Sequence, residues 1–461
     1  MVEAKYSQVD KRQKEISDMK FSMEVINTIA NGTNKFINCE FHNISKVVSQ
    51  GTLTFRNCKF FYSNNSKSYF QGSDSHILFE DCNFNKGGRL YFEKFSDIEF
   101  YNCSASTKLI FKAVKSVKLF KCGDEKNGSI SNLQFDDTRL DCLYSDCSIL
   151  DRINILKSFN GKFIVNGGDI GNIEFNRILE KAEIKLSAHN LFEQDLYVFS
   201  LVIKDSFFAG KLDLKYLNIE VLEMPNLSPV ENRNVLFHNI KVYSRLNLSN
   251  SFLDGFTLND VNLENAELRL GGSFIRNTIF SNIKWPIGYV VNEELPENPS
   301  PKEKINYYSR LKEVYQQLKH KSFIDNNRLD GLKFYRNEMD AYFQKIKLDK
   351  TESRWSRFLL RVDKLVSNFG QSYMRPLLIL LIFHLLISFV IWYLQSGSFL
   401  EIMSSSFNEG IWDYVYRLNP IHRPLDDWSK TINGIDAVSR FINGFFIYHF
   451  IKAIRRYSKV G

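Results

Sequence analysis

Hydrophobic residues follow three different patterns along the chain, and the pattern changes near residues 291 and 376. From residue 21 to 290, large apolar residues recur at short intervals in a polar background, with no long helical period. From residue 303 to 375, apolar residues recur at helical spacing. From residue 377 to 394, 18 residues in a row carry no charge. The three patterns predict a β-rich part, a helical neck and a membrane anchor.

Cysteines mark a repeat of about 20 residues in the first part. Each of five cysteines has a large apolar residue three positions before it, as in Phe36–Ile37–Asn38–Cys39. An interior cysteine behaves as a small hydrophobe, and a short coil buries its apolar side only against neighbouring coils. We therefore expect stacked coils with one interior column formed by Cys39, Cys58, Cys82, Cys103 and Cys122.

A period of five residues stands near the end of this part. The repeating residue is leucine, at Leu248, Leu253, Leu258, Leu263 and Leu268. Together with the earlier Phe–x–x–Cys–x–Phe units, this spacing resembles the pentapeptide-repeat family. The resemblance implies a right-handed, four-sided parallel β-helix over residues 21–290, with the leucines and cysteines pointing inward. Between residues 130 and 240 the five-residue register is poor, so a more general parallel β-helix also fits there.

The composition of the chain changes at both ends of the predicted stack. Residues 1–20 are highly charged and predict a short helix that caps the first coil, because exposed strand edges need a cover. This segment has no apolar core and does not resemble a secretory signal, so we expect the chain before residue 376 to stay in the cytosol. Residues 291–302 form a proline-rich linker that ends the stack.

The helical neck is predicted as a hairpin over residues 303–349, followed by a basic amphipathic juxtamembrane helix over 350–375. The hairpin is similar to the one that follows the repeats in many bacterial membrane-bound pentapeptide-repeat proteins. Residues 302–375 contain 17 basic and 9 acidic residues, which suits an anionic lipid surface. The basic residues expected at that surface are Arg354, Arg357, Arg361 and Lys364. Packing of the amphipathic helix on the hairpin is the alternative.

The uncharged run predicts a first transmembrane helix at residues 376–395, because 18 helical residues span about 27 Å, close to a hydrocarbon core. A second helix at 431–452 has fewer apolar residues. Basic residues lie before the first helix and in the tail 453–461, and the positive-inside rule then places both termini in the cytosol. This arrangement requires a second crossing or a re-entrant dip of the chain, and we expect two spans, with residues 396–430 as an extracytoplasmic loop.

Polar residues inside the predicted spans are the candidate functional residues. Asp436 and Arg440 are four residues apart and can pair on one helical face, and His384 interrupts the first span. Charges inside a membrane usually face a bundle interior or a water-filled path. A pore or an intersubunit pair is one interpretation, and a salt bridge at the rim is the other. Two spans cannot enclose a path alone, so a pore would require a homo-oligomer.

The sequence contains no compact catalytic constellation and no paired Cys/His motif of a zinc site, so we expect neither enzyme activity nor a cofactor or metal. Residues 1–301 hold 35 basic and 37 acidic residues, which argues against an acidic DNA mimic, and we expect no nucleic-acid partner. We predict a homo-oligomeric inner-membrane protein whose cytosolic β-helix is a scaffold or sensor for an unidentified cytosolic protein. The alternative is an oligomeric membrane effector or ion-conducting pore in stress or phage defence.

Overall fold

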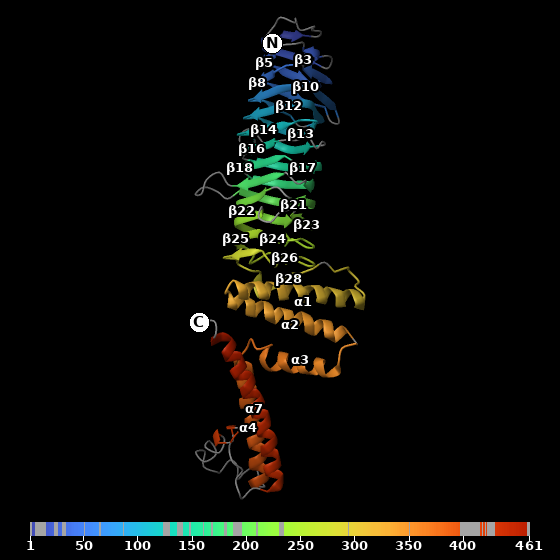
Figure 1. Cartoon of the computed structure of the whole chain (residues 1–461). Coiled ribbons are helices and arrows are strands. Elements are labelled where there is room, and N and C mark those ends of the chain that lie inside the picture. The colour runs from blue at the N-terminus through green and yellow to red at the C-terminus, as the bar shows by residue number, and fades with distance from the viewer. Residues whose placement is uncertain are drawn as a thin grey trace. The chain divides into compact units, whose positions relative to one another are not determined.

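The computed structural model shows two compact units, Met1–Glu294 and Leu295–Gly461, and each is described by itself (Figure 1). The residues that the structure describes are 2–4, 15–22, 26–29, 34–49, 51–63, 66–85, 87–122, 130–135, 142–146, 149–159, 161–166, 169–178, 182–187, 196–208, 211–229, 235–293, 295–349, 351–396, 415–416, 418–419, 421 and 429–458.

The first unit is a right-handed parallel β-solenoid whose strands stack along one axis (Figure 1). A short 3₁₀ helix, η1, spans Ile287–Tyr289 before the last strand. The strands are β1 Val2–Ala4, β2 Glu15–Ser17, β3 Met19–Ser22, β4 Ile26–Ile29, β5 Asn34–Ile37, β6 Glu40–His42, β7 Lys46–Ser49, β8 Leu53–Arg56, β9 Lys59–Phe61, β10 Lys67–Glu80, β11 Asn83–Phe84, β12 Arg89–Tyr101, β13 Ser104–Lys112, β14 Ser116–Phe120, β15 Ile130–Phe135, β16 Cys142–Asp146, β17 Ile149–Phe159, β18 Lys162–Asn166, β19 Asp169–Ile178, β20 Glu183–Ser187, β21 Leu196–Phe208, β22 Lys211–Glu223, β23 Leu227–Pro229, β24 Val235–Asn247, β25 Phe256–Asn262, β26 Glu267–Arg269, β27 Ile279–Ser281 and β28 Val291–Asn292.

The register of the strands repeats about every 21 residues, so equivalent side chains of successive coils lie above one another. Phe36 pairs with Phe55, Phe55 with Phe79, and Phe79 with Phe100. Their rings stack with centroids 5.0, 5.1 and 5.0 Å apart. Aromatic stacking adds to the burial of apolar area, and the core of the early coils is therefore built from columns of phenylalanine.

The second unit begins with the helical hairpin of α1 (Pro301–Ile324) and α2 (Arg328–Leu348). Ser300 caps α1 through a capping box, because its hydroxyl accepts from the Glu303 backbone N–H while the Glu303 carboxylate accepts from the Ser300 N–H. Lys319 of α1 donates to Glu338 of α2 at 2.7 Å. The predicted helical hairpin is therefore present, and its first helix begins at Pro301.

Three further helices of the second unit lie among the described residues: α3 (Arg354–Ser367), α4 (Met374–Ser396) and α7 (Lys430–Ser458). Helices α4 and α7 lie side by side, with the rings of Phe383 and Phe446 6.1 Å apart (Figure 1). By length and composition, Met374–Leu394 is the one helix among the described residues that is long and apolar enough to cross a membrane.

Some expectations need correction. The helix predicted over residues 1–20 is wrong for β1, β2 and the part of β3 that falls in it, because these residues pair as strands with later coils. The remaining residues of that segment, apart from Asp18, lie outside the described residues. Most of the loop predicted at 396–430 also lies outside them. The tail predicted from residue 453 continues α7 as far as Ser458.

Candidate functional site

The ten residues predicted to form the repeat core are all buried inside the solenoid. The Cys58 thiol donates to the Phe36 carbonyl at 3.5 Å, and the Cys103 thiol donates to the Phe79 carbonyl at 3.5 Å. Burial raises the pKa of the Cys103 thiol well above its ordinary value, which keeps this thiol protonated and unreactive. The thiol column therefore satisfies backbone carbonyls between coils.

Hydroxyl groups take the same role in the later coils. Ser273 donates to the Leu248 carbonyl at 2.6 Å, Thr278 donates to the Leu253 carbonyl at 2.9 Å, and Ser251 donates to the Met224 carbonyl at 3.1 Å. Small donors thus tie these coils to the coil before them, thiols in the early coils and hydroxyls in the late coils. Structural packing explains these residues, and no chemistry is required of them.

Asn and Asp residues occupy a corner where the backbone turns with positive φ. Asn38 and Asn57, each just before a cysteine, have φ of 54° and 50°. The Asn57 side-chain amide donates to the Asn38 Oδ1 at 2.8 Å. Asn and Asp tolerate this left-handed conformation better than other non-glycine residues. The Asn–Cys pairs in the sequence were a signal for this corner.

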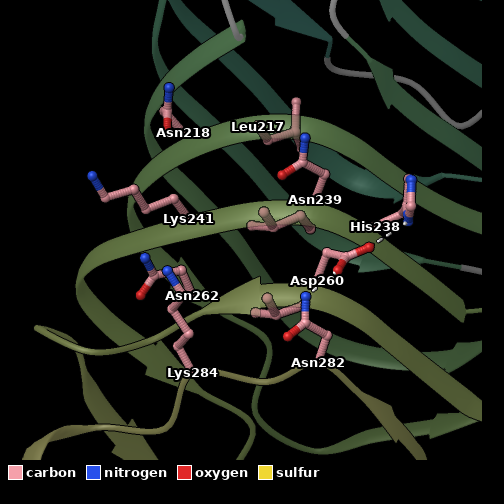
Figure 2. A pocket seen from close by; sticks show the side chains of 11 residues that line it. Leu217, Asn218, His238, Asn239, Lys241, Asp260, Asn262, Asn282 and Lys284 are labelled. Carbon is pink, nitrogen blue, oxygen red and sulfur yellow. Dashed lines mark hydrogen bonds and ion pairs between the residues drawn. The ribbon is translucent and has the colours of Figure 1, made fainter. Parts of the chain in front are cut away.

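A groove of about 430 Å³ lies beside the same kind of corner in the later coils (Figure 2). On one side Figure 2 shows Lys241 and Lys284, with Asn218 and Asn262 beside them. The lining residues are Leu217, Asn218, His238, Asn239, Ile240, Lys241, Asp260, Val261, Asn262, Asn282 and Lys284.

The other side of the groove is a hydrogen-bonded polar row. The Asn282 amide donates to the Asp260 Oδ1 at 2.6 Å, and the His238 Nδ1 lies 3.9 Å from the Asp260 Oδ2. This row and the two lysines present amide, carboxylate, imidazole and ammonium groups on one open surface. Such a surface can bind a polar ligand that carries negative charge. Sequence reasoning missed it, although Asn218, Lys241, Asn262 and Lys284 recur at about the coil spacing.

The membrane candidates form a second site, the polar seam, defined as His384 and Ser388 of α4 with Asp436, Ser439 and Asn443 of α7. All five residues are buried. The Asn443 Nδ2 and His384 Nδ1 lie 3.3 Å apart, so this face of α7 is turned toward α4. Spacings of three and four residues place Asp436 and Ser439 on the same face of α7 as Asn443.

Hydrogen bonds link most of the polar seam. Arg440 Nε donates to the Asp436 Oδ2 at 2.8 Å, and the Ser439 hydroxyl donates to the Asp436 carbonyl at 3.0 Å. The Ser388 hydroxyl has no hydrogen-bond partner among the described residues. The structure thus brings His384 to Asn443 of α7 and pairs Asp436 with Arg440.

The outward faces of α4 and α7 are apolar. On α7, Phe441 is 81% exposed, and Val438 and Tyr448 are exposed on the same side. On α4, the exposed side chains include Ile382 and Leu386. Burial of polar residues between two helices with exposed apolar residues outside is the arrangement expected in lipid.

The four basic residues predicted on α3 differ in their surroundings. Arg354 and Arg361 are exposed. Arg357 donates to the Glu352 carbonyl at 3.0 Å, and Lys364 donates to Asp340 of α2 at 2.6 Å. Two of the four cations are thus engaged by the protein itself.

Among the residues that the structure describes, no three His, Cys, Asp or Glu side chains gather as a metal site would require. No protein-family model, curated protein or solved structure matches the chain. The candidate functional surfaces are therefore the solenoid groove, the polar seam and the surface of α3.

Proposed function

We propose that the protein is a non-enzymatic, membrane-anchored scaffold or sensor. The solenoid binds a partner in the cytosol, and the α4–α7 pair holds it at the inner membrane, as in the membrane-bound pentapeptide-repeat proteins that the sequence resembles. One observation supports this most strongly: the chain combines a solenoid with a polar exterior and a helical pair with an apolar exterior. A protein built this way works where water meets lipid.

In the proposal α7 is a second span despite its charges. Its 29 residues correspond to about 43 Å, longer than a hydrocarbon core. Asp436 lies on the inward face and pairs with Arg440, and these two residues are the only charged ones between Thr431 and Ile451. The mean hydropathy of α7 counts both charges fully. Their placement, however, lowers the free energy cost of inserting them into a membrane.

The proposed ligand surface is the groove of Figure 2, and the partner is a cytosolic protein with an acidic segment. Lys241 and Lys284 are exposed and lie on one edge of the groove, as Figure 2 shows. Charged groups at the rim of an interface steer association and set specificity more than they add affinity. Reversing both charges should slow association with an acidic partner and so weaken binding, without unfolding the solenoid.

The test is an affinity pull-down with the full chain in detergent. We compare wild type, the groove variant Lys241→Glu with Lys284→Glu, and a control with the same charge change, Lys46→Glu with Lys67→Glu, at exposed positions of earlier coils. The proposal expects a protein that wild type and control retain and the groove variant loses. Recovery of the same proteins by all three would contradict the groove as the ligand surface.

The polar seam favours a second candidate, an oligomeric membrane effector whose spans conduct ions. Asp436, His384 and Asn443 place polar groups inside the membrane pair, which in an oligomer could contribute to a path. Purified protein in liposomes should then conduct, and Asp436→Ala should change the current. Silent bilayers from protein that detergent sizing shows to be oligomeric would exclude this candidate.

A further inference from the structure

Helix α3 carries an uncovered apolar face. Trp355 is 73% exposed, Leu365 70% and Leu359 63%, and Phe358 is also more than half exposed. These residues occur at positions 355, 358, 359 and 365, which share one side of a helix. A contiguous surface of large apolar side chains is rare on a water-exposed helix and marks an interaction site.

Polar residues of α3 beside and opposite this apolar face contact other helices of the same unit. Lys364 donates to Asp340 at 2.6 Å and lies 5.2 Å from the centre of the Phe343 ring, both on α2. Asp363 lies 3.7 Å from His449 of α7. These contacts fix the rotation of α3 about its axis, so its apolar face cannot turn toward the hairpin. The alternative given by the sequence, in which the amphipathic helix packs on the hairpin, therefore does not hold for Trp355.

The connection to α4 is also fixed. Asn368, Phe369 and Gly370 all have positive φ, and the Gly370 N–H donates to the Ser367 hydroxyl at 2.8 Å. Phe369 is fully buried, and the Gln371 side chain donates to the Leu332 carbonyl at 2.8 Å. Figure 1 shows α3 running roughly across the direction of α4. A helix that runs across a membrane span lies along the membrane surface.

We propose that α3 lies in the headgroup region of an anionic bilayer, with Trp355, Phe358, Leu359 and Leu365 inserted between lipids. Arg354 and Arg361 are exposed beside this face and supply the cations for lipid phosphates, whereas Arg357 and Lys364 do not. An amphipathic helix with a tryptophan and basic flanks is suited to this depth. The inference rests on the proposed membrane anchoring and adds the lipid class and the residues that recognise it.

The test uses the full chain in vesicles made of equal parts phosphatidylcholine and phosphatidylglycerol. The difference in fluorescence between wild type and Trp355→Phe isolates the emission of Trp355. We expect lipids brominated close to the headgroup to quench this emission strongly, and aqueous acrylamide to quench it weakly.

A pair of charge variants tests the lipid class. Arg361→Gln should lower the ratio of lipid-docked to water-exposed Trp355 by about fivefold, since a cation near an anionic surface contributes about that factor. Arg336→Gln removes the same charge from an exposed position on α2 and should leave the ratio unchanged. In vesicles of phosphatidylcholine alone, wild type and Arg361→Gln should give the same ratio. An equal effect of both variants in anionic vesicles would contradict the assigned role of Arg361.

Co-flotation of the protein with the vesicles separates this inference from the proposed function. If the protein floats but acrylamide quenches Trp355 and brominated lipid does not, α3 is in water and the inference fails alone. Protection of Trp355 from both quenchers would mean that a second copy covers the face, which also overturns it. Failure to float would overturn the membrane anchor and the inference together.

Discussion

The solenoid and the α4–α7 pair arrange their side chains in opposite ways. In the solenoid, phenylalanine, leucine and cysteine fill the interior, and Lys, Asn and Glu lie on the surface. Between α4 and α7, the interior contains His384, Ser388, Asp436, Ser439 and Asn443, and the surface carries leucine, isoleucine and phenylalanine. Under the proposed membrane anchoring, the difference means that one chain is folded for two solvents, because water favours the first arrangement and lipid permits the second.

The largest effect is expected from opening the solenoid core. Phe79 is fully buried and stacks on Phe55 and Phe100. Phe79→Ala should destabilise the solenoid by about 3–5 kcal/mol, through lost burial and the cavity left behind. Thermal unfolding of the purified full chain, followed by circular dichroism, measures the change. The control is Phe199→Ala at a side chain that is 50% exposed, and equal losses in both variants would contradict the assigned core.

The second-largest effect is expected from a charge placed on the outer surface of α7, compared with the same charge on the surface of the solenoid. Phe441→Asp places a charge on the outward face of α7 and should cost about 2.5–3.5 kcal/mol of membrane insertion. The fraction of protein that resists alkaline extraction from membranes should fall accordingly. Phe199→Asp makes the same change on the solenoid surface and should leave that fraction unaltered. A water-exposed α7 would tolerate both substitutions alike.

A smaller effect is expected from the ion pair inside the seam. Asp436→Ala leaves Arg440 without its carboxylate, whereas the double variant Asp436→Ala with Arg440→Ala removes both charges. We expect a coupling of about 1–2 kcal/mol in a double-mutant cycle measured by thermal unfolding in detergent. Additive losses, with no coupling, would mean that the pair does not stabilise the α4–α7 contact.

The smallest effect on stability is expected from substitutions of two buried serines, Ser273 and Ser388. Ser273 donates to the Leu248 carbonyl in the solenoid, so Ser273→Ala should cost about 1 kcal/mol. The Ser388 hydroxyl lacks a partner among the described residues, so Ser388→Ala should be neutral or slightly stabilising. Thermal unfolding measures both changes in stability. A larger loss of stability for Ser388→Ala than for Ser273→Ala would contradict the hydrogen bonding assigned to the two serines.

The repeat core could be predicted from sequence because in-register parallel coils place equivalent residues in contact. Spacings of five and about 20 residues therefore predicted the burial of Leu258 and Cys82 without knowledge of the rest of the fold. The N-terminal segment was mispredicted because its charges suit a helix. Tertiary pairing decides there instead, since Ile16 lies in a strand that pairs with β5 and is buried.

The sites depended on contacts that a sequence pattern does not contain. The amphipathic stripe of α3 was visible, but the pairing of Lys364 with Asp340, 24 residues earlier, required the packed helices. The groove of Figure 2 required the register of coils whose connections vary in length. The ion pair of Asp436 and Arg440 was predicted because four-residue spacing on a helix is a local property.

The central proposal is that the chain crosses a membrane twice, through α4 and α7. The most direct measurement is labelling of Ser429→Cys and Gly461→Cys by a membrane-impermeant thiol reagent, in spheroplasts and in inverted membrane vesicles. We predict that Ser429→Cys is labelled only in spheroplasts and Gly461→Cys only in inverted vesicles. Labelling of Gly461→Cys in intact spheroplasts, or of Ser429→Cys only from the cytoplasmic side, would contradict the claim.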